Sequence, residues 1–228
     1  MRCIKLAILT VLLPFGAQAD KLSIGVGVGT LGPEISASLK LLNNFDAVAA
    51  YSSLDYDDTF SDDDQNEFTA SARIEAPRIG IQYFPLSNFG FFLEGGMVFG
   101  SPKIDIAFQA DDNAQFEVND VMYNVADIGT LTGSASFDVE SAPYLLAGFG
   151  RSVGGGLGLS ISAGLISYGS MDVDIQNSQC TLGSNLLERT QLCGTLQANI
   201  LAEESKVNSD LEGFELWPFL RVGLSYSF

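Results

Sequence analysis

WPFLRVGLSYSF (217–228) ends the chain, and its bulky and small side chains alternate at every second position. The bulky set is Leu220, Val222, Leu224, Tyr226 and Phe228, and the residues between them are Arg221, Gly223, Ser225 and Ser227. Successive side chains of a β-strand point to opposite faces of its sheet. This period of two therefore predicts a strand with one apolar face and one small or polar face.

The same alternation recurs along the chain and predicts eight strands, over 21–30, 34–42, 45–56, 72–84, 89–104, 138–151, 157–171 and 214–228. The second face is rich in glycine and serine, which suits a crowded, narrow lumen. Short turns alternate with long segments at 57–71, 105–137 and 172–213, with a short exception at 31–33. This order predicts an all-β fold, an eight-stranded antiparallel up-and-down transmembrane β-barrel with long outer loops and both termini in the periplasm.

The first residues have the form of a secretory signal peptide. Arg2 and Lys5 precede an apolar run over 6–15, and Ala17-Gln18-Ala19 follows it. The run is shorter than the roughly 20 residues of a membrane-spanning helix. We therefore expect residues 1–19 to be cleaved as a signal peptide and residues 20–228 to form the outer-membrane barrel.

The composition excludes several classes of function. The chain has 28 acidic residues against 11 Lys and Arg, and a net charge of −17, so it lacks the basic stripe that nucleic-acid binding requires. It contains no histidine, the side chain that most readily serves as a general base near neutral pH. The sequence thus predicts no enzymatic activity, no catalytic residues and no cofactor.

Several charged residues fall on the inward phase of the predicted strands. They are Glu34, Lys40, Arg78, Glu94, Glu140 and Arg221, together with Gln82. Charges facing hydrocarbon are costly, at about 2–4 kcal/mol for Arg or Lys at the bilayer midplane, so these side chains are expected to face the lumen and pair. A closed ion-pair network would plug the lumen, whereas an incomplete one would leave a narrow water path. Pro77 lacks a backbone N–H, so a bulge that changes the inward phase is expected beside it.

Two features are predicted for the last long segment. Export to an oxidising compartment favours a loop-closing disulfide between Cys180 and Cys193, with two unpaired thiols as the alternative. Apolar residues at near-helical spacing over 196–212 predict a short amphipathic helix. Packing on the barrel rim or its own loop is favoured for it, with binding of a partner as the alternative.

Acidic residues crowd the segment after the third predicted strand. Asp62, Asp63 and Asp64 are the centre of this cluster and a candidate site for a divalent cation. Their spacing fits no EF-hand loop, so a solvated, mutually repelling loop is favoured over a metal site.

The chain end resembles the assembly signal of bacterial outer-membrane barrels, with apolar or aromatic Leu224 and Tyr226 at alternate positions before the terminal Phe228. VGTLG (28–32), YNVADIGTLTG (123–133) and APYLLAGFG (142–150) resemble a family of small barrels similar to the CarO-type ornithine-uptake porins. The resemblance implies the eight-stranded fold, the outer membrane with its lipid and lipopolysaccharide as surroundings, and the barrel-assembly machinery as a partner. It brings no substrate-reading motif to particular residues.

Two functions follow from these observations. The first is a narrow porin-like path for small solutes, preferably cationic, since the loops are acidic. The alternative is a sealed structural or interaction barrel that acts through its extracellular loops. A soluble carrier of lipocalin type would instead need a polar outer face.

Overall fold

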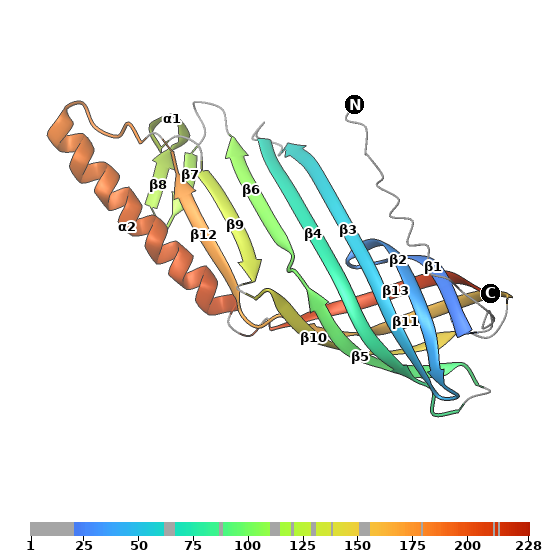
Figure 1. Cartoon of the computed structure of the whole chain (residues 1–228). Helices are drawn as coiled ribbons and strands as arrows, with labels where there is room; N and C mark the ends of the chain where they lie inside the picture. The colour runs from blue at the N-terminus through green and yellow to red at the C-terminus, as the bar shows by residue number, and fades with distance from the viewer. Residues whose placement is uncertain are drawn as a thin grey trace.

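Eight antiparallel strands close into a barrel in the computed structural model of the chain (Figure 1). The structure describes residues 21–61, 67–86, 89–109, 115–119, 121–128, 131–137, 139–150, 156–178, 180–211, 213 and 215–228. The expected signal peptide, 1–19, and the aspartates Asp62, Asp63 and Asp64 lie outside these residues.

The barrel strands follow the predicted order. They are β1 (Leu22–Gly29), β2 (Gly32–Leu42), β3 (Phe45–Ser61), β4 (Glu67–Tyr83), β5 (Phe91–Phe99), β10 (Ser141–Gly150), β11 (Gly156–Ser167) and β13 (Leu216–Ser227). Pairing of β1 with β13 and of β4 with β5 completes the ring. Closure pairs the first and last strands of the ring, so neither is left as a free edge, as a membrane requires.

Side chains on the outer face of the barrel are apolar, and those on the inner face are a mixture of apolar and polar residues. Leu157, Leu145 and Ile35 point outward and are 79%, 65% and 63% exposed, whereas their strand neighbours Ser160, Leu146 and Glu34 are buried within the barrel. Leu224, Tyr226 and Phe228 of the chain end belong to the outward set. An apolar outer belt around a closed sheet is the surface that hydrocarbon requires.

The long segments expected to be loops contain further sheet, which corrects the prediction for 57–71, 105–137 and 172–213. β3 and β4 continue beyond the barrel as a pair, and β4 pairs there with β6 (Lys103–Gln109). β6 pairs with β9 (Leu131–Phe137), and β9 pairs with β12 (Met171–Asn177). We call these three strands and the distal halves of β3 and β4 the sheet extension, and Figure 1 shows it leading away from the barrel.

The fork between the barrel and the extension lies on β4. Residues Arg78 to Tyr83 pair with β5, and residues Glu67 to Arg73 pair with β6. The expected bulge at Pro77 is wrong, because Pro77 stays in register with Tyr51 of β3. Pro77 instead lies between the two pairing regions, where β4 has no ladder partner on that side.

The polarity of both faces inverts at this fork. Along the outward face of β4, Ile81 and Ile79 are apolar and exposed, while Glu75 and Arg73 beyond Pro77 are charged. Along the inward face, Arg78 is followed toward the extension by the apolar Ala76 and Ile74. The apolar outer belt therefore ends near Pro77, and the sheet extension lies outside the part of the molecule that faces hydrocarbon.

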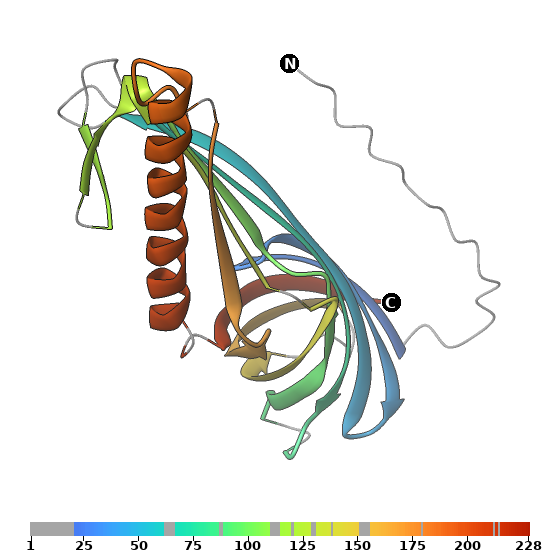
Figure 2. The same cartoon turned by 90° about the vertical axis from the view of Figure 1, so that its left-hand side faces the viewer.

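A long helix covers part of the extension. α2 (Leu186–Leu211) stands alongside β12 and apart from the barrel, and it is longer than the helix predicted over 196–212 (Figure 2). Its Leu196 and Ile200 are buried in a second apolar cluster. In the described part of the chain, no helix is both long and apolar enough to cross a membrane.

Side chains of α2 also cap the outer edge of β12. The Asn208 side chain accepts a hydrogen bond from the Val173 N–H (2.8 Å) and donates one to the Val173 carbonyl (3.0 Å). The Glu204 carboxylate accepts one from the Ile175 N–H (3.2 Å). These contacts satisfy backbone groups that would otherwise template pairing with another strand.

Two smaller elements and a disulfide complete the extension. β7 (Gln115–Val118) and β8 (Val121–Asn124) form a hairpin followed by α1 (Val125–Ile128). Cys180 and Cys193 form the predicted disulfide, which ties the start of α2 to the segment after β12.

Candidate functional site: the barrel lumen

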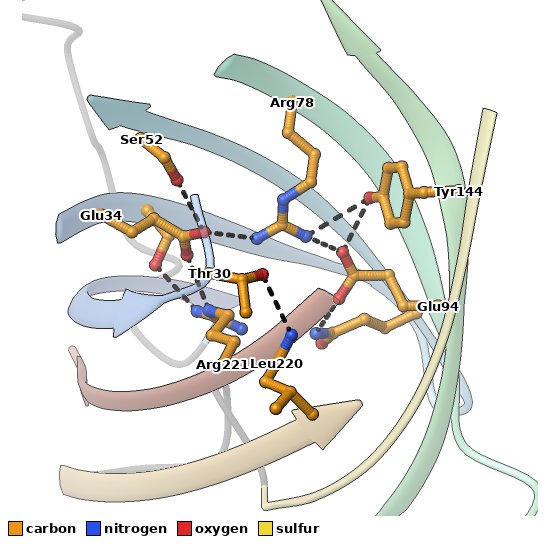
Figure 3. A network of polar contacts seen from close by, with 10 residues as sticks. Thr30, Glu34, Ser52, Arg78, Glu94, Tyr144, Leu220 and Arg221 are labelled. Carbon is orange, nitrogen blue, oxygen red and sulfur yellow. Dashed lines mark hydrogen bonds and ion pairs between the residues drawn. The ribbon is translucent and has the colours of Figure 1, made fainter. Parts of the chain in front are cut away.

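A layer of charged and polar side chains crosses the lumen, surrounded by the strands that carry the apolar outer belt. Arg78 of β4 lies between Glu34 of β2 and Glu94 of β5, with its Nη2 3.0 Å from a Glu34 oxygen and its Nη1 paired with Glu94. Arg221 of β13 approaches the second Glu34 oxygen at 2.7 Å. Figure 3 shows these side chains converging from strands that are far apart in the sequence.

Neutral side chains complete the layer. The Tyr144 hydroxyl and the Gln82 amide each donate a hydrogen bond to Glu94 at 2.7 Å, and the Ser52 hydroxyl donates one to Glu34 at 3.3 Å. We call the set Glu34, Ser52, Arg78, Gln82, Glu94, Tyr144 and Arg221 the polar layer.

Burial of the polar layer is nearly complete. Glu94, Arg78, Glu34 and Arg221 are 0%, 2%, 4% and 6% exposed. Their two positive and two negative charges balance. Buried ions survive only when paired and hydrogen-bonded, and removing one partner typically costs about 3–5 kcal/mol. The charges of the polar layer therefore compensate one another within the lumen as a matched set.

An apolar layer lies above the polar layer, on the side of the sheet extension. Its buried members are Leu31, Ile74, Ala76, Val98, Phe137, Ala142, Tyr144, Leu146, Ile166, Tyr168 and Phe219. Phe137 stacks on Tyr168 and meets Trp217 edge-on, with ring centroids 5.1 and 6.1 Å apart.

The two layers meet at Arg78. Its guanidinium carbon lies 5.3 Å from the ring centroids of both Tyr144 and Phe219, within the range of a cation–π contact. The lumen thus contains two successive layers of buried side chains, first the ion pairs and then the packed rings.

The structure brings together four of the six charged residues predicted for the lumen: Glu34, Arg78, Glu94 and Arg221. Lys40 lies apart from them, half-buried near the β2–β3 turn and opposite Asp46 in the strand register. Glu140 is exposed, so its lumen assignment is wrong. The reason is that β10 begins at Ser141, and Glu140 precedes it in the fork, where its carbonyl accepts a hydrogen bond from the Gly100 N–H.

Sequence reasoning missed three inward residues of interest. Asp46 is buried in the lumen, but FDAVAAYSSLDY (45–56) has small or polar residues on both faces, so its alternation does not identify the inward side. Ser52 belongs to the same strand. Tyr144 lies at alternate positions with Ala142 and Leu146 in APYLLAGFG, and all three are buried on the inward face. The alternation of this segment could have identified Tyr144, although Tyr and Leu are bulkier than the glycine and serine expected in the lumen.

No set of three or more Cys, Asp or Glu side chains within the described ranges is arranged to hold a metal ion. The lumen carboxylates Glu34 and Glu94 are instead occupied by arginine and neutral donors. The charged side chains of the lumen therefore pair with one another, and Glu34 and Glu94 have protein partners in place of a metal ion.

No family model and no curated protein sequence matches the chain. Several chains of solved structures match it, and two of them do so along nearly its whole length. Acinetobacter baumannii CarO superposes with a TM-score of 0.61 at 19% identity, covering 93% of this chain and 100% of that chain. The chain has the fold of CarO. A second structure, A. baumannii CarO2, gives a TM-score of 0.64 at 15% identity and covers 92% and 100%.

This likeness establishes the fold: a small closed barrel of eight antiparallel strands. It agrees with the apolar outer belt and the inward-facing ion pairs, which a soluble carrier with a polar outer face does not have.

Proposed function

We propose that this protein is a closed barrel of the bacterial outer membrane, which acts through the sheet extension and α2 that it holds beyond the bilayer. The observation that supports the proposal is the pair of successive layers of buried side chains in the lumen. Arg78, Glu94 and Gln82 are each at most 2% exposed, so water hardly reaches the side chains that span the middle of the barrel. Eight strands enclose a space that side chains can fill.

Conductance measurements test this proposal. Purified, refolded protein in a planar bilayer is expected to insert without current steps. Regular steps whose ion preference changes in Glu94→Gln or Arg221→Gln, and not in the matched outer-face variant Arg73→Gln, would overturn it. Arg73 is a suitable control because its side chain is 70% exposed on the outward face.

A narrow path for small cationic solutes is the second candidate function. It is favoured by the sharing of Glu34 between Arg78 and Arg221, since an acid with two partners can release one without becoming unpaired. The resemblance to ornithine-uptake porins and the net charge of −17 also support it. Swelling of protein-loaded liposomes in cationic, neutral and anionic amino acids, against protein-free liposomes, would distinguish a cation path from a sealed barrel.

Both chain ends are proposed to face the periplasm. In support, the Phe228 N–H donates to the Leu22 carbonyl at 3.2 Å, so the end of β13 lies beside the start of β1. A tag that contains a protease cleavage site is placed after Phe228. Added protease is expected to leave the tag intact in whole cells and to cleave it after the outer membrane is permeabilised. Cleavage in intact cells would reverse the orientation.

A further inference from the structure

A hollow of about 370 Å³ lies between α2 and the apolar face of the sheet extension. The sheet contributes Ile106, Gly133, Val173 and Ile175 to its lining, and α2 contributes Ile200 and Val207. Small-molecule pockets typically span about 300–1,000 Å³ and are mostly apolar. The hollow is therefore of a size to hold one ring or a short alkyl chain.

The floor of the hollow exists because a side chain is missing there. Gly133 lies in register between Ile106 of β6 and Ile175 of β12. A Cβ atom at Gly133 would meet no atom within 4 Å, whereas a Cβ at Gly164 of the barrel would overlap neighbouring backbone. Backbone crowding requires glycine at the barrel position. At position 133 glycine instead leaves room between two isoleucines.

The polar groups at the edge of the hollow are mainly acids. Glu117 of β7 and Glu203 of α2 both line it, and in the described chain neither carboxylate forms an ion pair. Thr132 is the remaining polar residue of the lining. Unpaired carboxylates beside an apolar cavity attract a cation and repel an anion, and the net charge of −17 reinforces this preference.

From this geometry we propose that the hollow between α2 and the sheet extension binds small organic cations, in which an apolar ring or chain carries a primary ammonium group. The apolar part occupies the space above Gly133, and the ammonium lies at the edge beside Glu117 and Glu203. The site is outside the lumen, so the proposal is independent of whether the barrel conducts.

Three probes that differ only in the polar group test the ligand class: benzylammonium, benzyl alcohol and benzoate. Binding to the full chain in detergent is followed by methyl NMR shifts of Ile106, Ile175 and Ile200, with the outward barrel residue Ile35 as a reporter of micelle effects. Benzylammonium is expected to bind with a Kd of about 1 mM, as its small size dictates. Benzyl alcohol should bind up to about fivefold more weakly, and benzoate should not shift these methyls.

Two variants with matched controls locate the site. Gly133→Leu is expected to abolish the benzylammonium shifts, whereas Gly194→Leu, which adds the same side chain on an open surface of α2, should not. Glu203→Gln should weaken benzylammonium up to about fivefold and leave benzyl alcohol unchanged. Asp172→Asn, on the exposed opposite face of the sheet, should alter neither.

The outcomes are decisive in either direction. Equal binding of benzoate, absence of any specific shift with benzylammonium, or unchanged binding in Gly133→Leu would overturn the proposal. If Gly133→Leu fails to fold, judged by faster amide hydrogen exchange in β9 and β12, Gly133→Ala replaces it. This smaller change should weaken benzylammonium about twofold through partial filling, and unchanged affinity in Gly133→Ala would overturn the proposal.

Discussion

Replacing Glu94 by glutamine tests the idea that the polar layer is a matched set of charges. Glu94 accepts hydrogen bonds from Gln82 and Tyr144 and is ion-paired with Arg78, all at essentially complete burial. Glutamine preserves the volume but leaves the layer with one excess positive charge. Because a buried ion is then incompletely compensated, we expect a loss of about 3 kcal/mol or more of unfolding free energy. This is a large part of the roughly 5–15 kcal/mol by which folded proteins are stable.

The assay is reversible urea unfolding in lipid vesicles. The single tryptophan, Trp217, is half-buried against the apolar layer and reports unfolding by fluorescence. Asp55→Asn is the matched control, because the Asp55–Arg73 pair is 3.7 Å apart and mostly exposed, with an expected cost of at most about 1 kcal/mol.

A double variant separates charge imbalance from loss of contacts. Arg78→Met with Glu94→Gln removes the excess cation and leaves Glu34 paired with Arg221. It should therefore recover most of the stability lost in Glu94→Gln, since apolar replacement of buried ion pairs is often neutral. Equal costs for Glu94→Gln and Asp55→Asn, or no recovery in the double variant, would refute the reasoning.

Three further predictions concern the sheet extension and α2. Cys180→Ser should lower the stability of α2 by about 3 kcal/mol on the chain-entropy model, raising its hydrogen exchange while the heat-modifiable mobility of the barrel stays the same. Asn208→Ala leaves the Val173 N–H and carbonyl without their partner, so the β12 amides should exchange faster, consistent with a loss of about 1–3 kcal/mol, and unchanged exchange would contradict the edge-capping role. Hydrogen bonds from Ser184 lower the pKa of Glu188. The ionised Glu188 therefore stabilises the start of α2 above the ordinary pKa of 4.5, and this stabilisation is lost as the pH falls below it. Amide hydrogen exchange of the first turn of α2 should rise at that low pH, and Ser184→Ala should reduce this pH dependence.

Strand number and inside–outside phase of the barrel were predictable from sequence. Each strand meets lipid on one side and the lumen on the other, so the requirement is local and appears as a period of two within the strand itself. The glycines and serines that mark the inward face at Gly25, Gly27, Ser160 and Ser162 are examples.

The extension was missed for a physical reason. Beyond Pro77 neither face of β4 meets hydrocarbon, so its alternation is weaker and inverted, with Ala70 and Ala72 on the continuation of the lumen face and Ser71 and Arg73 on the other. Short strands such as β6 and β9 gain their stability from pairing with neighbours distant in the chain, which no local pattern records.

The sequence by itself determined that this chain closes a barrel with its apolar side chains outward, because each residue's preference for lipid or lumen is a property of that residue and its immediate neighbours. Only the tertiary structure decided which inward charges meet. Glu34, Arg78, Glu94 and Arg221 form one layer because strand register and tilt bring four strands to the same height, whereas Lys40 lies near the β2–β3 turn and Glu140 lies outside its strand.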